Sequence, residues 1–183
     1  MDVVCANTQK MAQLIEGLLA LSRLGSHELR RSRVDMGALA TAVWHELVPP
    51  DEREAIRFAV GELPDAVADA SLVRQVWVNL LDNALKFTAP KGDRAVEVGG
   101  HTAPGWTTYF VKDNGVGFDP VYASRLFGVF ERLHPARDFP GTGAGLAIVQ
   151  RIVRRHGGEV SAEGAVGEGA TFRFSLPDPE TSP

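Results

Sequence analysis

The chain has 183 residues, 44% of them hydrophobic and 23% charged, and a formal net charge of −4 at pH 7. These values are typical of a globular protein with a proper core, and they exclude a disordered tail, a collagen and a disulfide scaffold. The single cysteine, Cys5, cannot form an internal disulfide, which favours a reducing compartment. Mild acidity argues against a nucleic-acid binder, and we find no apolar run of membrane-spanning length and no signal peptide. We therefore expect a cytoplasmic protein.

The apolar pattern of residues 2–24 predicts one long helix. Its apolar residues recur at spacings of three and four, which is typical of a coiled coil or a bundle helix: Met11, Leu14, Leu18 and Leu21. Such a helix packs either on its own domain or on other helices of a bundle, and we favour the bundle. The polar and basic residues 25–34 that follow are expected to form a linker.

Three further long helices are expected, besides a short one described below. Asp35 is a candidate N-cap for a helix over about 36–48, and Asp69 or Ser71 is one for a helix that runs to about residue 87. The last helix begins at Gly145 and ends at 156, with Gly157 as its C-terminal cap. His156, together with two arginines, is expected to be a cation at the negative end of this helix.

Alternating patterns predict five strands, over residues 56–60, 94–100, 106–112, 158–163 and 169–176. A glycine- and proline-rich stretch at 113–143 is expected to contain one short helix near 121–132. The order of elements favours an α+β fold, a two-layer sandwich in which helices pack on a mixed, mainly antiparallel sheet.

The helical segment NLLDNALKFT, residues 79–88, combines an apolar stripe with a polar flank. Asn79, Asn83 and Lys86 fall within an arc of about 60°. Amide oxygens suit Mg²⁺ and an ammonium suits phosphate, although an ordinary solvated face remains the alternative. The stripe beside them comprises Val73, Val76, Leu80, Ala84 and Phe87.

The segment DNGVGF, residues 113–118, directly follows a predicted strand. Gly115 and Gly117 allow the backbone to approach a flat ligand closely. Asp113 at the strand end is able to accept a hydrogen bond from an exocyclic amine such as that of adenine. The alternative is a simple turn.

The segment GTGAGL, residues 141–146, leads into the last predicted helix. Glycine-rich backbone before a helix is a site for an anion, because free N–H groups and the helix dipole point at it. The segment lacks the Gly-Lys-Ser/Thr of a Walker loop, and Leu146 stands where a dinucleotide fingerprint has its third glycine. A flexible hinge is the alternative.

Together these segments resemble the sensor histidine kinases. NLLDNALKFT looks like their N box, DNGVGF like the G1 box, LFGVFERL at 126–133 like the F box and GTGAGLAI at 141–148 like the G2 box. The resemblance implies a Bergerat-type ATP-binding domain over 35–177. Residues 178–183 at the terminus are expected to form a loose tail. Residues 1–24 would be a partial second helix of the dimerisation hairpin. Within the family, the sequence around the G2 box is most similar to phytochrome-like kinases.

The resemblance also implies roles for individual residues toward ATP and Mg²⁺. Asn83 would ligate Mg²⁺, and Asn79 would support the metal and the phosphates. Lys86 and Arg132 would contact phosphate, and Asp113 would read the adenine amine. Other nucleotide-binding residues would be Gly115, Gly117, Phe118, Gly141, Thr142, Gly143, Gly145 and Leu146. Residues 118–142 would form a lid over ATP, anchored by Phe127 and Phe130.

Related gyrase, mismatch-repair and heat-shock ATPases place a glutamate where Asn79 stands, so hydrolysis to water should be slow here. The γ-phosphate would pass instead to a histidine on a hairpin largely absent from this chain. His27 mimics the acceptor motif but follows the helix end, and we interpret it as a decoy. The expected partners are that hairpin, a response regulator receiver domain and, for the parent protein, a second copy. The alternatives are a non-enzymatic nucleotide-binding or docking module and a serine kinase of the anti-sigma type.

Overall fold

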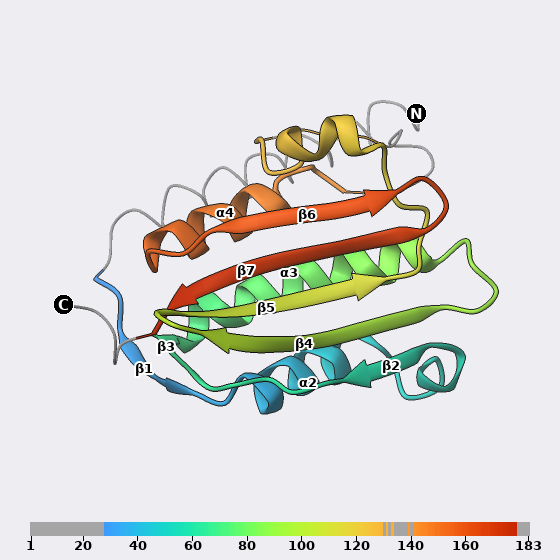
Figure 1. Cartoon of the computed structure of the whole chain (residues 1–183). Coiled ribbons are helices and arrows are strands. Elements are labelled where there is room, and N and C mark those ends of the chain that lie inside the picture. Colours follow the sequence, from blue (N-terminus) through green and yellow to red (C-terminus); the bar gives the residue numbers. More distant parts are fainter. Residues whose placement is uncertain (1–27, 130, 132, 134–138, 140, 179–183) are drawn as a thin grey trace, which may run out of the picture.

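The computed structural model describes residues 28–129, 131, 133, 139 and 141–178. A five-stranded sheet is its largest feature, and only its edge strand β2 runs parallel to a neighbour, β4 (Figure 1). In spatial order the strands are β2 (Arg57–Val60), β4 (Ala95–Ala103), β5 (Trp106–Asp113), β7 (Gly169–Pro177) and β6 (Val160–Ala165). The predicted mixed, mainly antiparallel sheet is therefore confirmed.

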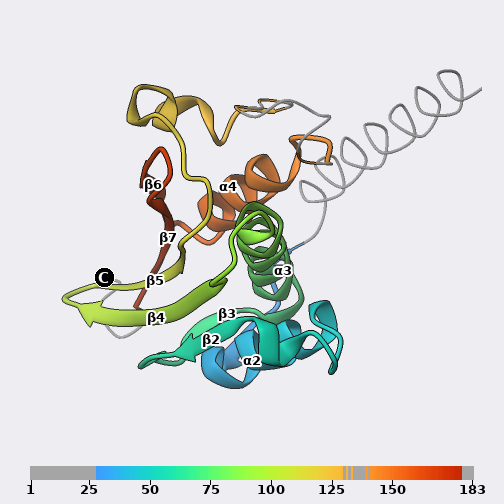
Figure 2. The same ribbon diagram turned by 90° about the vertical axis from the view of Figure 1, so that its right-hand side faces the viewer.

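Helices α2 (Met36–Leu47), α3 (Ala70–Thr88) and α4 (Gly145–Arg155) all lie to one side of this sheet (Figure 2). The start of α2 is capped as predicted, because Asp35 Oδ1 accepts a hydrogen bond of 2.8 Å from the N–H of Ala38. At the start of α3 the cap is Asp69. The last helix ends where expected, with Gly157 at a φ of +88° directly after it. The α+β sandwich is thus confirmed together with its helix ends.

The core fills the space between the helices and the sheet, and α3 lies at its centre. Trp77 on α3 is fully buried. Its ring meets those of Phe174 and Tyr109 edge-on, at centroid distances of 5.4 and 6.3 Å. Aromatic contacts of this geometry stabilise a core beyond the area that they bury. They fix α3 across the sheet and so determine where its polar flank lies.

Four short elements differ from the prediction. Part of the expected linker forms β1 (Arg31–Val34), which pairs antiparallel with β3 (Ala66–Asp69) in a separate two-stranded sheet. The sequence pattern missed both strands, because each is short and exists only with the other as its partner. The helix expected over 121–132 is instead a 3₁₀ helix, η2 (Pro120–Arg125). A second 3₁₀ turn, η1 (Arg53–Ala55), precedes β2.

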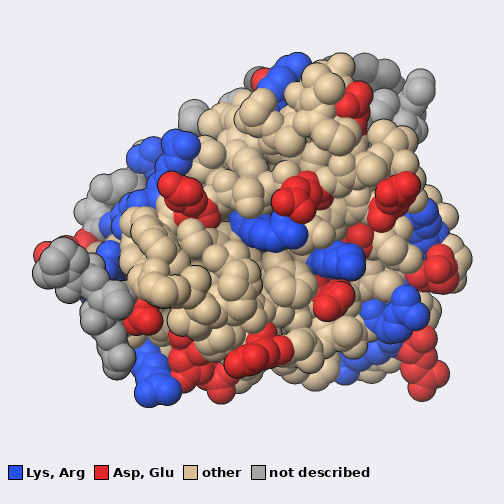
Figure 3. Space-filling view, in the orientation of Figure 1, with Lys and Arg blue, Asp and Glu red and all other residues tan. Residues whose placement is uncertain are grey.

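The face of the sheet opposite the helices carries acidic and basic side chains side by side (Figure 3). Arg173 on β7 and Glu163 on β6, for example, form an ion pair of 2.9 Å. Because the two signs alternate, the face in this view has no large field of one sign.

Several predictions lie outside the described residues: the helix over 2–24, the interpretation of His27, and the roles of Phe130 and Arg132 in the lid. Among the residues that the structure does describe, none of the helices combines the length and the hydropathy that crossing a membrane requires.

Candidate functional site

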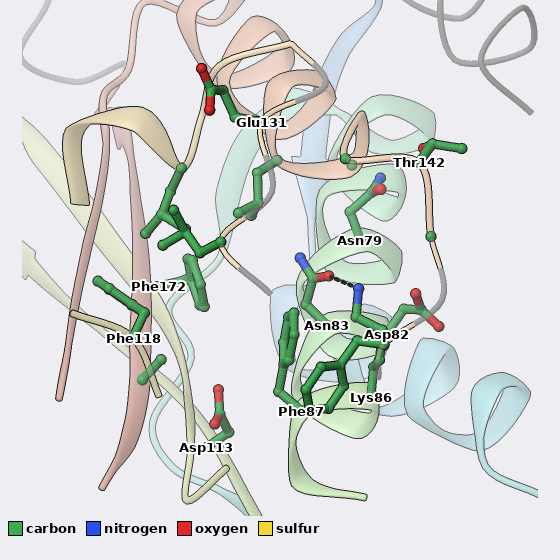
Figure 4. A pocket seen from close by; sticks show the side chains of 18 of the residues that line it. Asn79, Asp82, Asn83, Lys86, Phe87, Asp113, Phe118, Glu131, Thr142 and Phe172 are labelled. Atoms are coloured by element: carbon green, nitrogen blue, oxygen red, sulfur yellow. Dashed lines mark hydrogen bonds between the residues drawn. The ribbon is translucent and has the colours of Figure 1, made fainter. Parts of the chain in front are cut away.

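A cavity of about 220 Å³ lies between the flank of α3, the end of β5 and the loop before α4 (Figure 4). The segments that sequence analysis singled out all contribute to its wall. The predicted site residues that line it are Asn79, Asn83, Lys86, Asp113, Gly117, Phe118, Gly141, Thr142, Gly143, Gly145 and Leu146. Three segments far apart in the sequence therefore converge on one cavity.

The polar flank of α3 faces this cavity, as the helical spacing predicts. The ammonium of Lys86 donates a hydrogen bond of 3.3 Å to Asn83 Oδ1 (Figure 4). One turn earlier, Asn79 Nδ2 donates to the carbonyl of Gln75 at 2.7 Å, which leaves the amide oxygen facing the loop before α4. This wall presents amide oxygens beside a cation, a combination suited to a metal–phosphate group.

Asp113, where β5 ends, lies across the cavity from Asn83 and Lys86 (Figure 4) and is only 4% exposed. Burial raises the pKa of its carboxyl to about 6, although hydrogen bonds from the backbone of Gly115 and Ala170 oppose the rise. The Gly115 N–H donates to Asp113 Oδ1 at 2.8 Å. A buried carboxylate of this kind is a strong acceptor for an N–H donor of a ligand.

The two glycines after Asp113 have different roles. Gly115 is not among the residues lining the cavity; it holds the carboxylate of Asp113 instead. Gly117 does line it, at a φ of +61°, and a Cβ there would lie 1.9 Å from the carbonyl oxygen of Ala165. Only glycine permits this approach between the loop and β6. Phe118 follows, and its ring lies 6.3 Å from that of Phe172.

The glycine-rich loop closes the cavity in front of α4. Gly141 and Gly143 have φ values of +138° and +76°, which favour glycine. Thr142 Oγ1 accepts a hydrogen bond of 3.2 Å from the N–H of Ala144. Helix α4 then begins without a side-chain cap, so that its first N–H groups stay available to an anion.

Helical periodicity places Phe87 in the apolar stripe of the core, and this residue was not predicted to be part of the site. Phe87 lines the cavity, with Lys86 Nζ 4.4 Å from its ring centroid and the Phe139 ring at 5.0 Å. Its position at the edge of the stripe, next to Lys86, was the one feature of the sequence that could have indicated a place in the cavity wall. Asp82, Ala170 and Phe172 were also not predicted. The remaining lining residues lie within the expected lid but were not named individually: Leu126, Glu131, Leu133 and Phe139. Phe127, expected to anchor the lid, is buried in the core.

His156 corrects another expectation, because it is not a cation at the end of α4. Its side chain is 2% exposed, and burial lowers its pKa. Nε2 accepts a hydrogen bond of 3.0 Å from the N–H of Asp69, and Nδ1 lies 2.8 Å from the carbonyl of Ile152. A ring that accepts at Nε2 is neutral. The histidine links the end of α4 to the start of α3.

Comparisons with known proteins agree with this geometry. The model of a family described as histidine kinase-, DNA gyrase B- and HSP90-like ATPase matches residues 68–180, which include every wall of the cavity. Phytochrome-like protein Cph1 of Synechocystis is 31% identical over 96% of this chain and 23% of its own length. Cyanobacterial phytochrome B of Nostoc is 35% identical over 93% and 23%.

Among solved structures, full-length ShkA in complex with AMPPNP aligns with a TM-score of 0.74 and 32% identity. The alignment covers 93% of this chain and 36% of ShkA. The chain thus spans about a quarter of the length of the two curated relatives.

Proposed function

Since this chain belongs to the family of histidine kinase-, DNA gyrase B- and HSP90-like ATPases, we propose that it is the ATP-binding catalytic unit of a sensor histidine kinase. One observation carries the proposal. A single cavity has a buried carboxylate, Asp113, on one side, and an ammonium with amide oxygens on the side formed by α3 (Figure 4). These two sides match the exocyclic amine of adenine and the phosphates of ATP.

In this proposal the base of ATP lies at Asp113, between the loop at Gly117 and the ring of Phe118. The phosphates extend toward Lys86 and the glycine-rich loop, residues 141–146. The uncapped start of α4 adds N–H donors for them. Phosphates on this side and the amine on the other set the direction of the nucleotide.

Magnesium fits the residues of the phosphate side. Asn83 offers a hard amide oxygen directly beside the ammonium of Lys86, and Asn79 adds a second carboxamide one turn away. We propose that Asn83 ligates Mg²⁺, with Asn79 in support. The ion, when bound, would neutralise charge on the phosphates, while Lys86 holds the same group from the protein side.

The proposed reaction transfers the γ-phosphoryl group of ATP to a histidine on a dimerisation hairpin, for relay to the receiver domain of a response regulator. Such transfers depend mainly on positioning and charge stabilisation. Lys86 and the glycine-rich loop position the phosphates, and Arg132 is proposed to reach the γ-phosphate. Asn79 is not a base, so water is not activated. By its resemblance, the parent protein would be a dimeric, phytochrome-like cytoplasmic kinase whose hairpin includes residues 1–24.

Calorimetric titration with Mg-ADP and Mg-AMPPNP tests nucleotide binding directly. We expect magnesium-dependent binding that Asp113→Asn weakens, because the amide presents an uncharged acceptor. Asp51→Asn, at an exposed turn, is the matched control and should bind like the wild type. A folded chain that binds neither nucleotide would contradict the proposal.

Transfer is tested with a separate hairpin that carries an acceptor histidine, supplied in trans with labelled ATP. Acid-labile phosphate on the hairpin supports the kinase. Nucleotide binding without transfer favours the alternative, a docking module in which ATP only sets the shape of the lid. Strong acid-labile labelling of the chain alone at His27 would overturn its interpretation as a decoy.

A further inference from the structure

The loop that carries Asp113 is held from two sides by backbone hydrogen bonds of its residue Val116. The Val116 N–H donates to the carbonyl of Phe87, at the end of α3, over 3.1 Å. The Val116 carbonyl accepts from the N–H of Gly167, in the turn between β6 and β7, over 2.7 Å. The loop is therefore clamped between the end of α3 and this turn.

Lys91 connects the β6–β7 turn back to the end of α3 through two hydrogen bonds. Its side-chain Nζ donates to the carbonyl of Gly167 over 2.9 Å, and its backbone N–H donates to the carbonyl of Thr88 over 2.8 Å. Thr88 follows Phe87 in α3, so the chain of hydrogen bonds returns to its start. Among the described residues, no other side chain forms a hydrogen bond with the turn at 165–169.

The same turn leads directly into the candidate base site. Gly169 has a φ of +94°, and a Cβ there would lie 2.0 Å from the carbonyl oxygen of Asp113. Ala170 lines the cavity, and its backbone hydrogen bond lowers the pKa of the Asp113 carboxyl. In Figure 1 the β6–β7 turn and the end of β5 lie at the same end of the sheet. A shift of the turn therefore moves the surroundings of Asp113.

We propose that Lys91 is a positioning residue for base recognition: by holding the β6–β7 turn against the loop 113–117, it fixes Asp113 for the exocyclic amine of a purine. The inference rests on the proposed binding of adenine in this cavity. Lys91 is not among the residues that line the cavity, so the proposed role is an indirect one. Its effect is on selectivity for the base and not on affinity for phosphate.

The test compares three probes by calorimetry in the presence of magnesium: ADP, inosine diphosphate, which lacks the amine, and pyrophosphate. We expect Lys91→Met to weaken ADP binding about fivefold, the effect of losing one hydrogen bond of about 1 kcal/mol. Affinity for pyrophosphate should stay unchanged, so the preference for ADP over inosine diphosphate falls. Because the hydrogen bond is also lost from the chain without nucleotide, the thermal midpoint should fall by about 2–4 °C. Lys91→Arg keeps a donor and should restore most of the preference.

Two further variants sharpen the comparison. Gly167→Ala strains the backbone of the turn that accepts the Lys91 hydrogen bond, because the φ of Gly167 is +82°. The added Cβ meets nothing within 4 Å, so there is no steric clash. This variant should also lower the preference for ADP over inosine diphosphate. Lys112→Met removes an exposed lysine next to Asp113 in sequence and should behave as wild type.

Unchanged selectivity in Lys91→Met, or an equal loss of ADP and pyrophosphate affinity, would overturn the inference while leaving the proposed function intact. A wild-type chain that binds no ADP would overturn the proposed function, and the inference with it.

Discussion

The carboxamide of Asn79 lies against Gly145 so closely that a Cβ on this glycine would be 2.7 Å from Asn79 Oδ1. The contact joins the polar flank of α3 to the start of α4, the two elements that we propose to hold the phosphates. Asn79 has little freedom to move away, because its Nδ2 already donates to the carbonyl of Gln75. The close approach of α3 to the start of α4 thus requires that residue 145 has no Cβ.

Gly145→Ala is expected to weaken Mg-ADP binding about tenfold, since the added methyl displaces the carboxamide of Asn79. In Asn79→Ala the clashing group is absent, so the double variant should lose less binding free energy than the two single variants together. Calorimetric titration of the four proteins measures this coupling. Strictly additive losses would contradict the contact.

Binding of ADP should depend on pH through Asp113. Because burial raises the pKa of this carboxyl to about 6, the group takes up a proton as the pH falls through 6 and loses its charge. We expect ADP affinity to fall between pH 7 and pH 5. Asp113→Asn should bind ADP more weakly, and its affinity should change less over the same pH range. If the affinities of the wild type and the variant fall in parallel, Asp113 is not the group responsible.

The same pKa shift affects stability. The folded pKa is above 3.8, the ordinary value of an aspartate, so the contribution of Asp113 to stability is fully present below 3.8 and is lost as the pH rises through about 6. Asp113→Asn removes this dependence. The free energy of unfolding of this variant minus that of the wild type should therefore be larger at pH 8 than at pH 4. Urea denaturation at the two pH values measures this difference.

Because His156 is buried, we expect the protein to lose stability at acidic pH. Burial lowers its pKa below 6.5, the ordinary value of a histidine, and the charged groups around it are Arg31, Arg155 and Asp69. Its contribution is present above 6.5 and is lost as the pH falls from 6.5 toward the folded pKa. In His156→Gln the free energy of unfolding should change less between pH 7.5 and pH 5.5.

The matched control for this experiment is His101→Gln, at an exposed position on β4. It should keep the wild-type dependence on pH. If both variants keep it, the acid-sensitive group lies elsewhere, and the neutral ring of His156 does not govern stability in this range.

Gly117→Ala tests the close approach of the loop to β6. The new Cβ would lie 1.9 Å from the carbonyl oxygen of Ala165, and the φ of +61° is itself unfavourable for alanine. We expect a loss of stability of about 2 kcal/mol or more and no measurable ADP binding. Gly92→Ala, whose Cβ meets nothing within 4 Å, should keep both properties within experimental error. Thermal unfolding and calorimetry provide the two readouts.

Local patterns were sufficient to predict most of the candidate site. Asn79, Asn83 and Lys86 share a flank because helical periodicity places residues three and four apart on one side. Asp113 was recognisable because it ends a strand and precedes a turn. The same patterns misplaced Phe87, which lies at the border of the apolar stripe, where periodicity alone does not separate the core from a cavity wall.

The sequence by itself determined the three α-helices with Asp35 and Asp69 at their starts and Gly157 after the last, since each depends on neighbours within a few residues. It also identified Asn79, Asn83, Lys86 and Asp113 among the polar groups of the cavity. Only the tertiary structure decided that β1 pairs with β3, that Phe139 covers Phe87 and that Lys91 reaches Gly167. It also decided that His156 is neutral. These features arise from contacts between distant segments and from burial, and no local pattern encodes how much water a side chain loses when the chain folds.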